Sequence, residues 1–184
     1  GTYALTDTST LSLAFDGYNE EHGEPGGLRR SAAPNAVLYQ QDREATSRFF
    51  DRFELERYAG SVIYENEITP DTLLKISSWG GYYSRWSARQ RGGGFGTLPS
   101  GSAARTNSIE SQVFKTAGLD ARVRQNWDAW GETHSLTAGI QYYHDTSPRK
   151  DERGATPDAT DGVTRNESLR QTNYGSAFAE NRFV

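Results

Sequence analysis

The sequence of 184 residues contains no cysteine, which excludes disulfides, zinc–thiolate sites and a cysteine nucleophile. It also lacks any apolar run approaching the roughly 18 residues of a transmembrane helix, and it shows no signal peptide. The net charge of −4 lacks the basic excess that favours nucleic acid, so we expect no nucleic-acid partner. Methionine is absent too, and the chain starts at Gly1 and ends in a strand-like segment. We therefore expect an internal piece of a longer protein, in which a missing signal says nothing about compartment.

Apolar residues are also scarce, at 34% of the chain, so an ordinary two-layer core would be thin. Aromatic residues nevertheless reach 12%, with ten Tyr, eight Phe and four Trp. This combination is typical of strands that each have one apolar and one polar face.

Apolar and polar residues alternate along most segments with a period of two. In "AGLDARVRQNW", Leu119 and Val123 share one face, whereas Asp120, Arg122 and Arg124 share the other. The alternation is weaker at 52–66 and 73–87, where we expect a bulge or a change of register. The pattern predicts the end of one strand at residues 1–5 and six further strands, at 9–20, 47–66, 72–88, 111–128, 134–146 and 169–184.

Short turns and long loops alternate between these segments. Turn signals occur at 5–11, 68–74 and 130–136, each with an acidic residue beside threonine and then a leucine. Long polar stretches rich in Gly, Pro and Ser lie at roughly 21–46, 88–110 and 146–167. The sequence therefore predicts a series of β-hairpins with short turns at one end and long loops at the other.

The predicted strands favour a membrane barrel over a soluble sandwich. They run to 12–20 residues, whereas strands of globular proteins typically have about 5–6. A row containing Asp120, Arg122 and Arg124 would be costly in a dry core but faces water inside a wet barrel. A closed barrel also pairs every backbone group inside a bilayer. A soluble all-β protein remains the alternative. Aromatic residues near the expected membrane boundaries fit interfacial belts: Trp127, Trp130, Tyr142, Tyr143, Tyr82, Tyr83 and Trp86.

Several stretches together resemble the barrel of TonB-dependent outer-membrane receptors, especially the ferric dicitrate receptor group. They are "GYNEEHGEPGGL", "RFELERYAGSVIYENEITPDTLLK", "RQRGGGFGTLPSG", "LDARVRQNWDAWGETHSLTAGIQYYH" and "YGSAFAENRF". The resemblance implies an all-β, antiparallel transmembrane β-barrel of 22 strands with long extracellular loops. Residues 1–184 would supply about six of these strands, without the N-terminal plug or the remaining strands.

The resemblance also implies a function in the bacterial outer membrane. Such receptors import a ferric chelate, either ferric citrate or a siderophore complex, with energy from the TonB complex. TonB would act through the missing N-terminal part, outer-membrane lipid would surround the barrel, and the chelate would be cargo rather than a bound cofactor. A passive porin or another β-barrel protein is the alternative.

The stretch "RQRGGGFGTLPSG" at 89–101 has three possible interpretations. It lacks the Lys-Ser/Thr pair of a P-loop, and its glycines do not form G-x-G-x-x-G. A flexible linker is possible, but it would lie between two strands of one array. We interpret the stretch as an extracellular loop in which glycine permits positive φ and close approach of the backbone.

Arginine is the natural partner of an anionic, carboxylate-rich chelate, because its planar fork binds carboxylates through two parallel hydrogen bonds. The alternative is that loop arginines are solvated or paired, as Arg29 would be with Glu24. We expect Arg122 and Arg124 to pair with Asp120 and neighbouring strands, with plug contact as the alternative. The candidate ligand-binding residues are Arg89, Gln90, Arg91, Arg105, Asn107, Arg29 and Arg30.

No catalytic pattern is visible. The chain has neither a G-x-S-x-G elbow nor a paired catalytic carboxylate motif, so we expect no enzyme. We also expect no metal site: the acidic "NEEHGE" at 19–24 is typical of a solvated loop, and "PDATDG" does not meet the EF-hand spacing.

Overall fold

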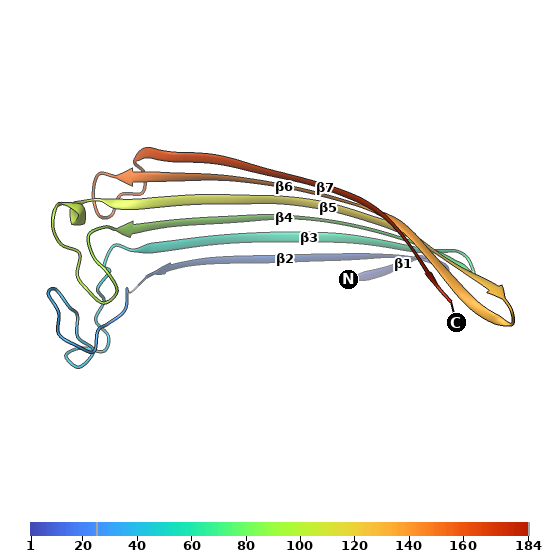
Figure 1. The fold of residues 1–184 in the computed structure, drawn as a ribbon, viewed down its shortest axis with the longest axis horizontal. Coiled ribbons are helices and arrows are strands. Elements are labelled where there is room, and N and C mark those ends of the chain that lie inside the picture. The colour runs from blue at the N-terminus through green and yellow to red at the C-terminus, as the bar shows by residue number, and fades with distance from the viewer. Residues whose placement is uncertain (25, 184) are drawn as a thin grey trace.

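A computed structural model describes residues 1–24 and 26–183; Pro25 of the predicted first loop and Val184 of the predicted last strand lie outside the described residues. The described chain forms a single seven-stranded antiparallel sheet in which the strands follow one another in chain order (Figure 1). The strands are β1 (Thr2–Thr6), β2 (Ser9–Gly23), β3 (Arg52–Thr69), β4 (Thr72–Gln90), β5 (Asn107–Ala129), β6 (Glu132–Gly154) and β7 (Val163–Arg182). The 3₁₀ helix η1 (Ser102–Arg105) lies between β4 and β5. Among the described residues, no helix has the length and apolar character needed to cross a membrane.

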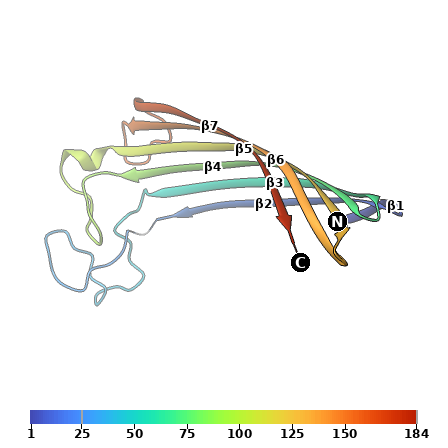
Figure 2. The same ribbon diagram turned by 45° about the vertical axis from the view of Figure 1, so that its right-hand side comes forward.

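Short turns and long loops are segregated to opposite ends of the sheet, as the sequence predicts (Figures 1 and 2). The three tight connections are residues 7–8, 70–71 and 130–131. The first loop (24–51), second loop (91–106) and third loop (155–162) lie at the other end. In the third turn, Trp130 and Gly131 both have positive φ, at 53° and 83°, which is the backbone of a tight type I′ hairpin turn.

The prediction of a long loop at 146–167 is wrong. β6 continues to Gly154 and β7 begins at Val163, so most of that polar stretch is paired strand. Pro148 suggested a loop because proline lacks the N–H that a ladder needs. In the structure it lies opposite Leu169 of β7, and the pairing of β5 with β6 is interrupted beside it between Gln112 and Lys115. The interruption is local, and the register is the same on both sides of it.

The expected bulge in the middle of β3 and β4 is also wrong. Their register runs without a shift from the pair Arg52–Ala88 to the pair Glu67–Leu73, and it changes only beside the turn. The alternation looks weak in the sequence for a different reason in each strand. β4 carries the large rings of Trp79 and Tyr83 on its polar face, and β3 carries charge on both faces at its loop end. Glu54 and Glu56 lie on one face there, and Arg57 lies on the other.

The register sorts side chains onto two faces of very different polarity. The face that we call the apolar face carries Leu119 and Val123 of β5 and Ile140 of β6, which are 40%, 39% and 57% exposed. The opposite, polar face carries Asp120, which is buried. Its carboxylate accepts hydrogen bonds from Arg122 Nε and Gln141 Nε2, both at 2.8 Å. Among described residues, the only buried hydrophobic side chains are Ala88 and Ile109, which pair with each other near the loop end of the apolar face. The middle of the apolar face is therefore left uncovered by this chain.

On the polar face, aromatic rings lie directly over glycines of the next strand. A Cβ added to Gly118 would lie 2.2 Å from the Trp79 ring, and one added to Gly139 would lie 2.7 Å from the Phe178 ring. These rings cover backbone that glycine would otherwise leave bare, so both glycines are required for close packing.

Replacing Gly118 with alanine should therefore lower the free energy of unfolding by about 1–3 kcal/mol, because the Trp79 ring must move off its strand. The matched control is Gly175→Ala, since the nearest atom to a Cβ there is 3.9 Å away. Urea titration of the full-length protein folded in lipid vesicles measures both variants. Equal stability of the two would show that the Trp79 ring does not depend on Gly118.

Candidate ligand-binding site on the loops

The first and second loops are joined by backbone hydrogen bonds into one body. Gly96 N–H donates to Gly26 O at 2.9 Å, Val37 N–H to Gly96 O at 3.0 Å, and Leu98 N–H to Asn35 O at 2.8 Å. The glycine-rich stretch is therefore fixed to the neighbouring loop and is not a flexible linker. It is a loop, as predicted, and its partner is the neighbouring loop.

Glycine is needed where the two loops approach each other. A Cβ on Gly27, which has φ 81°, would lie 2.2 Å from the Phe95 ring. A Cβ on Gly96, which has φ 63°, would lie 2.6 Å from Arg29 Cγ. At both positions the backbone is left-handed, and atoms of the other loop occupy the space where a Cβ would lie. Only glycine tolerates this combination.

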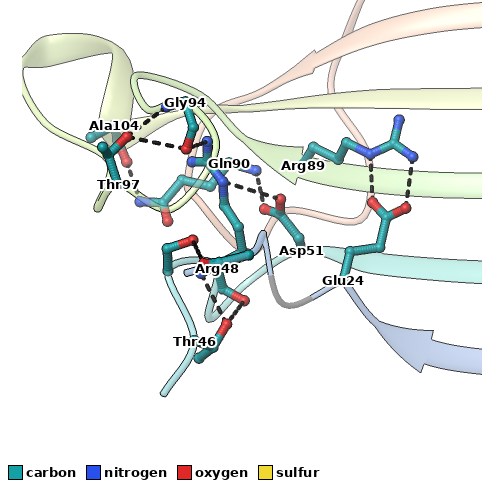
Figure 3. A network of polar contacts seen from close by, with 11 residues as sticks. Glu24, Thr46, Arg48, Asp51, Arg89, Gln90, Gly94, Thr97 and Ala104 are labelled. Carbon is teal, nitrogen blue, oxygen red and sulfur yellow. Dashed lines mark hydrogen bonds and ion pairs between the residues drawn. The ribbon is translucent and has the colours of Figure 1, made fainter. Parts of the chain in front are cut away.

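Arg48 and Asp51 fix the second loop to the base of the first (Figure 3). Arg48 Nη2 donates to Gly94 O at 3.2 Å, and its Nε lies 3.8 Å from Asp51 Oδ2. Asp51 Oδ1 also accepts the backbone N–H of Gln90 at 2.7 Å. Both side chains are nearly buried, at 10% and 6% exposed. Burial raises the pKa of Asp51, while the Gln90 N–H and the Arg48 guanidinium oppose that rise.

Sequence reasoning missed both residues. The strand predicted at 47–66 covers them, whereas β3 begins at Arg52. Nothing in "TSRFFD" distinguishes Arg48 from the other loop arginines, because its partners lie in a distant segment.

Arg89 forms a two-point ion pair with Glu24 beside this junction (Figure 3). Its Nη2 donates to Glu24 Oε1 at 2.9 Å, and its Nε donates to Oε2. One hypothesis from the sequence is that Glu24 pairs with Arg29. In the structure, Glu24 pairs with Arg89 instead. Hydrogen bonds from Arg89 hold the pKa of Glu24 below its ordinary value, although partial burial opposes the effect.

This pair should respond to acid. Because the folded-state pKa of Glu24 is depressed, its stabilising contribution is complete above the unfolded value of about 4.3 and is lost as pH falls through the folded value. We expect the spacing between spin labels on the first loop and on β4 to stay constant from pH 7 to 5 and to widen below pH 4. In Glu24→Gln, this step should be absent. An identical step in that variant would assign it to another group, such as Asp51.

Two other candidate residues are occupied by structural contacts. The Gln90 side chain donates to Ala104 O at 2.7 Å, which ties β4 to the end of the second loop. Asn107 is fully buried, and its Nδ2 donates to Ala159 O at 2.7 Å, which holds the third loop against β5. In this arrangement Asn107 has no surface that a ligand could reach.

The remaining candidates keep exposed or partly exposed guanidinium groups. Arg91 makes only a long contact, 3.5 Å from Nη1 to Thr106 Oγ1, and Arg105 is exposed at the end of η1. Neither Arg29 nor Arg30 forms an ion pair within the described chain. A hollow of about 610 Å³ brings these last two together with the glycine-rich stretch; its lining is Leu28, Arg29, Arg30, Gly94, Phe95 and Thr97.

Charges on the polar face form cross-strand ion pairs. Glu110 of β5 lies 3.7 Å from Arg85 and 3.4 Å from Arg149, and Arg149 continues to Asp151 at 3.0 Å. Arg122 pairs with Asp120 at 2.7 Å, as expected from the sequence. Within residues 1–24 and 26–183, no group of three or more His, Asp or Glu side chains is arranged to hold a metal ion.

Comparisons with known proteins identify the fold but not the family. No known protein family matches the sequence, and no curated protein does. Among solved structures, the chain is similar to the ferric citrate transporter FecA in its unliganded form, with a TM-score of 0.76 and 17% sequence identity. The match covers 98% of this chain and 25% of that one, so the chain spans about a quarter of the transporter's length. The predicted all-β, antiparallel barrel-segment fold is confirmed, and this neighbour is a transporter rather than an enzyme.

Proposed function

We propose that the chain supplies part of the wall and ligand-facing loops of an outer-membrane receptor. The receptor binds a ferric chelate, either ferric citrate or a siderophore complex, and imports it with energy from the TonB complex. The observation that carries this proposal is the uncovered, uncharged middle of the apolar face, in a sheet whose polar face carries cross-strand ion pairs.

The composition of that face fits lipid. We call a residue whose side chain lies on the apolar face an outward position. From β2 to β7, the outward positions in the middle of each strand carry no charge. One cross-strand row of such positions contains Leu13, Val62, Leu119 and Tyr142. An outer-membrane barrel requires an apolar band about 25 Å tall between aromatic girdles. Near the turns, Trp127 lies on the apolar face with its ring centroid 6.1 Å from that of Phe183, which suits such a girdle.

The predicted aromatic belt needs one correction. The register places Tyr83 and Tyr143 on the polar face, where Tyr83 packs against Phe114 with ring centroids 5.6 Å apart. These two residues therefore cannot contribute to a lipid-facing belt, whereas Tyr82 and Tyr142 can.

The loop hollow suits an anionic chelate. Arg29 and Arg30 line it without a carboxylate partner, and Gly94, Phe95 and Thr97 of the glycine-rich stretch also line it. FecA is by its title a ferric citrate transporter, and citrate presents carboxylates that match the arginine fork. We assign ligand contact first to Arg29 and Arg30, then to Arg91 and Arg105. Arg89, Gln90 and Asn107 hold the loops in position.

Binding of ferric citrate and of ferric siderophores to the full-length protein tests the proposal. The variant Arg29→Ala/Arg30→Ala should bind at least about tenfold more weakly, since each charge-assisted hydrogen bond contributes about 1.5–3 kcal/mol. The matched control is Arg124→Ala, an exposed arginine near the turns that should bind as the wild type does. Unchanged binding by the double variant would remove the hollow from the site. Uptake that survives collapse of the proton-motive force would indicate a passive pore.

A further inference from the structure

One charge interrupts the apolar face of β5. Every second residue from Asn107 to Ala129 points to this face, and Lys115 is the only charged residue among them. Toward the turns it is followed on this face by Ala117, Leu119 and Ala121. The lysine is exposed, and its ammonium group forms no ion pair within the described chain.

The neighbours of Lys115 across the sheet are also uncharged. It pairs with Tyr82 of β4 and Thr146 of β6, and residues in cross-strand pairs lie on the same face. Lys150, further along β6 on this face, is different, because its Nζ lies 2.8 Å from Glu152 Oε1. Lys115 is thus a cation to which neighbouring strands offer no carboxylate.

Lys115 also lies closer to the turns than the charged residues Glu56 of β3 and Lys150 of β6, which are on the same face. The cross-strand row through Lys115 contains Tyr82 and Tyr58, and Glu56 is one outward position nearer the loops on β3. On β6, Lys150 is two outward positions beyond Thr146. Lys115 is therefore at the edge of the uncharged band, where a bilayer changes from acyl chains to headgroups.

A chain of polar side chains extends from this edge across β6 and β7. Tyr142 Oη donates to Asn173 Oδ1 at 3.0 Å, and His144 Nδ1 contacts the same oxygen at 2.8 Å. The other nitrogen of His144, Nε2, lies 3.0 Å from Thr146 Oγ1. Because two donors converge on Asn173 Oδ1, the amide nitrogen of this exposed residue faces away from them and remains available as a donor.

We propose that Lys115 binds the phosphate of a membrane-lipid headgroup, with the Asn173 amide and the Tyr82 hydroxyl donating to other headgroup oxygens. Lysine suits this role as a compact charge on a flexible apolar stem that reaches from the band to the headgroup level. The acyl chains of the same lipid would lie along Ala117 and Leu119. This inference rests on the proposed contact of the apolar face with lipid.

The test uses the full-length protein purified in detergent and offered two lipids with the same acyl chains. One is lipid A with its phosphates, and the other is the same lipid after enzymatic dephosphorylation. Native mass spectrometry counts the lipid retained, and thermal melting reports stabilisation. We expect the wild type to retain the phosphorylated lipid preferentially and Lys115→Gln to lose most of that preference, by fivefold or more. Lys115→Arg should keep it.

The matched control is Lys150→Gln, which removes a partly exposed lysine of the same face that already has a carboxylate partner. It should retain lipid as the wild type does. The inference is overturned if Lys115→Gln matches the wild type, or if inorganic phosphate alone stabilises the wild type as well as lipid A does. Ferric chelate binding should be normal in Lys115→Gln. Loss of the lipid preference alone can therefore be distinguished from failure of the proposed receptor function.

Discussion

Replacing Ile140 with arginine should lower the free energy of unfolding in a bilayer by about 2–4 kcal/mol, the cost of an arginine on a lipid-facing barrel strand near the midplane. Ile140 is 57% exposed in the middle of the apolar face, where it pairs with Ala121 and Ala177. On the proposed lipid-facing side, an arginine there would be surrounded by uncharged side chains and acyl chains. Urea titration of the full-length protein in lipid vesicles, followed by tryptophan fluorescence, measures the loss.

The matched control places the same arginine on the polar face. Thr172 of β7 is exposed and lies opposite Asp145 of β6, so Thr172→Arg gains a possible ion-pair partner and should change stability by less than about 0.5 kcal/mol. Equal losses for the two variants would contradict the assignment of faces. A folded, water-soluble Ile140→Arg protein without detergent would contradict the membrane proposal itself.

Replacing Asp51 with alanine should separate the first and second loops while leaving the sheet folded. The substitution leaves the Arg48 guanidinium nearly buried without an anion and removes the acceptor of the Gln90 N–H. Breaking a buried ion pair by removing one partner costs about 3–5 kcal/mol. We expect this cost to appear as local opening, because the register of β3 with β4 does not depend on Asp51.

Hydrogen exchange of the Gly96 and Leu98 amides reports this opening directly, since both donate across the two loops. We expect protection to fall by about a hundredfold or more, while amides in β4 and β5 stay protected. Asp42→Ala is the control, because Asp42 is exposed in the same loop and accepts only the Glu44 N–H, at 2.9 Å. Unchanged exchange in Asp51→Ala would show that the backbone bonds alone hold the loops together.

The sequence predicts those parts of the fold that depend on local pattern. Strand faces follow from alternation with a period of two, and the three tight turns follow from compact polar signals, so both could be predicted. The end of β6 could not. Pro148 and the charged residues that follow it are typical of a loop when taken alone, but pairing with β5 as far as Asn107–Gly154 extends the strand through them. Such cross-strand pairing is tertiary information that a local window does not contain.

The candidate site was predicted by residue type, which identifies arginine but not its partner. Arg89 and Arg29 look equivalent in the sequence, yet Arg89 meets Glu24 from a segment 65 residues away. Asn107 looks like a loop residue, but β5 begins there and the third loop covers it. Partner choice of this kind is determined when the loops fold together, so Arg29 and Arg30 could be separated from the rest only in the structure.

The regular pairing of the strands limits how such a wall can change length. From β2 to β5 each pair of strands keeps one register through its middle, so every residue is locked to a fixed partner. Adding a single residue inside β4 would turn all the side chains beyond it to the opposite side, exchanging Leu74 with Lys75 or Ile76 with Ser77. Adding two would preserve their orientation. Among proteins built this way, insertions and deletions inside strands should therefore involve an even number of residues. Those of an odd number should be confined to the turns and loops.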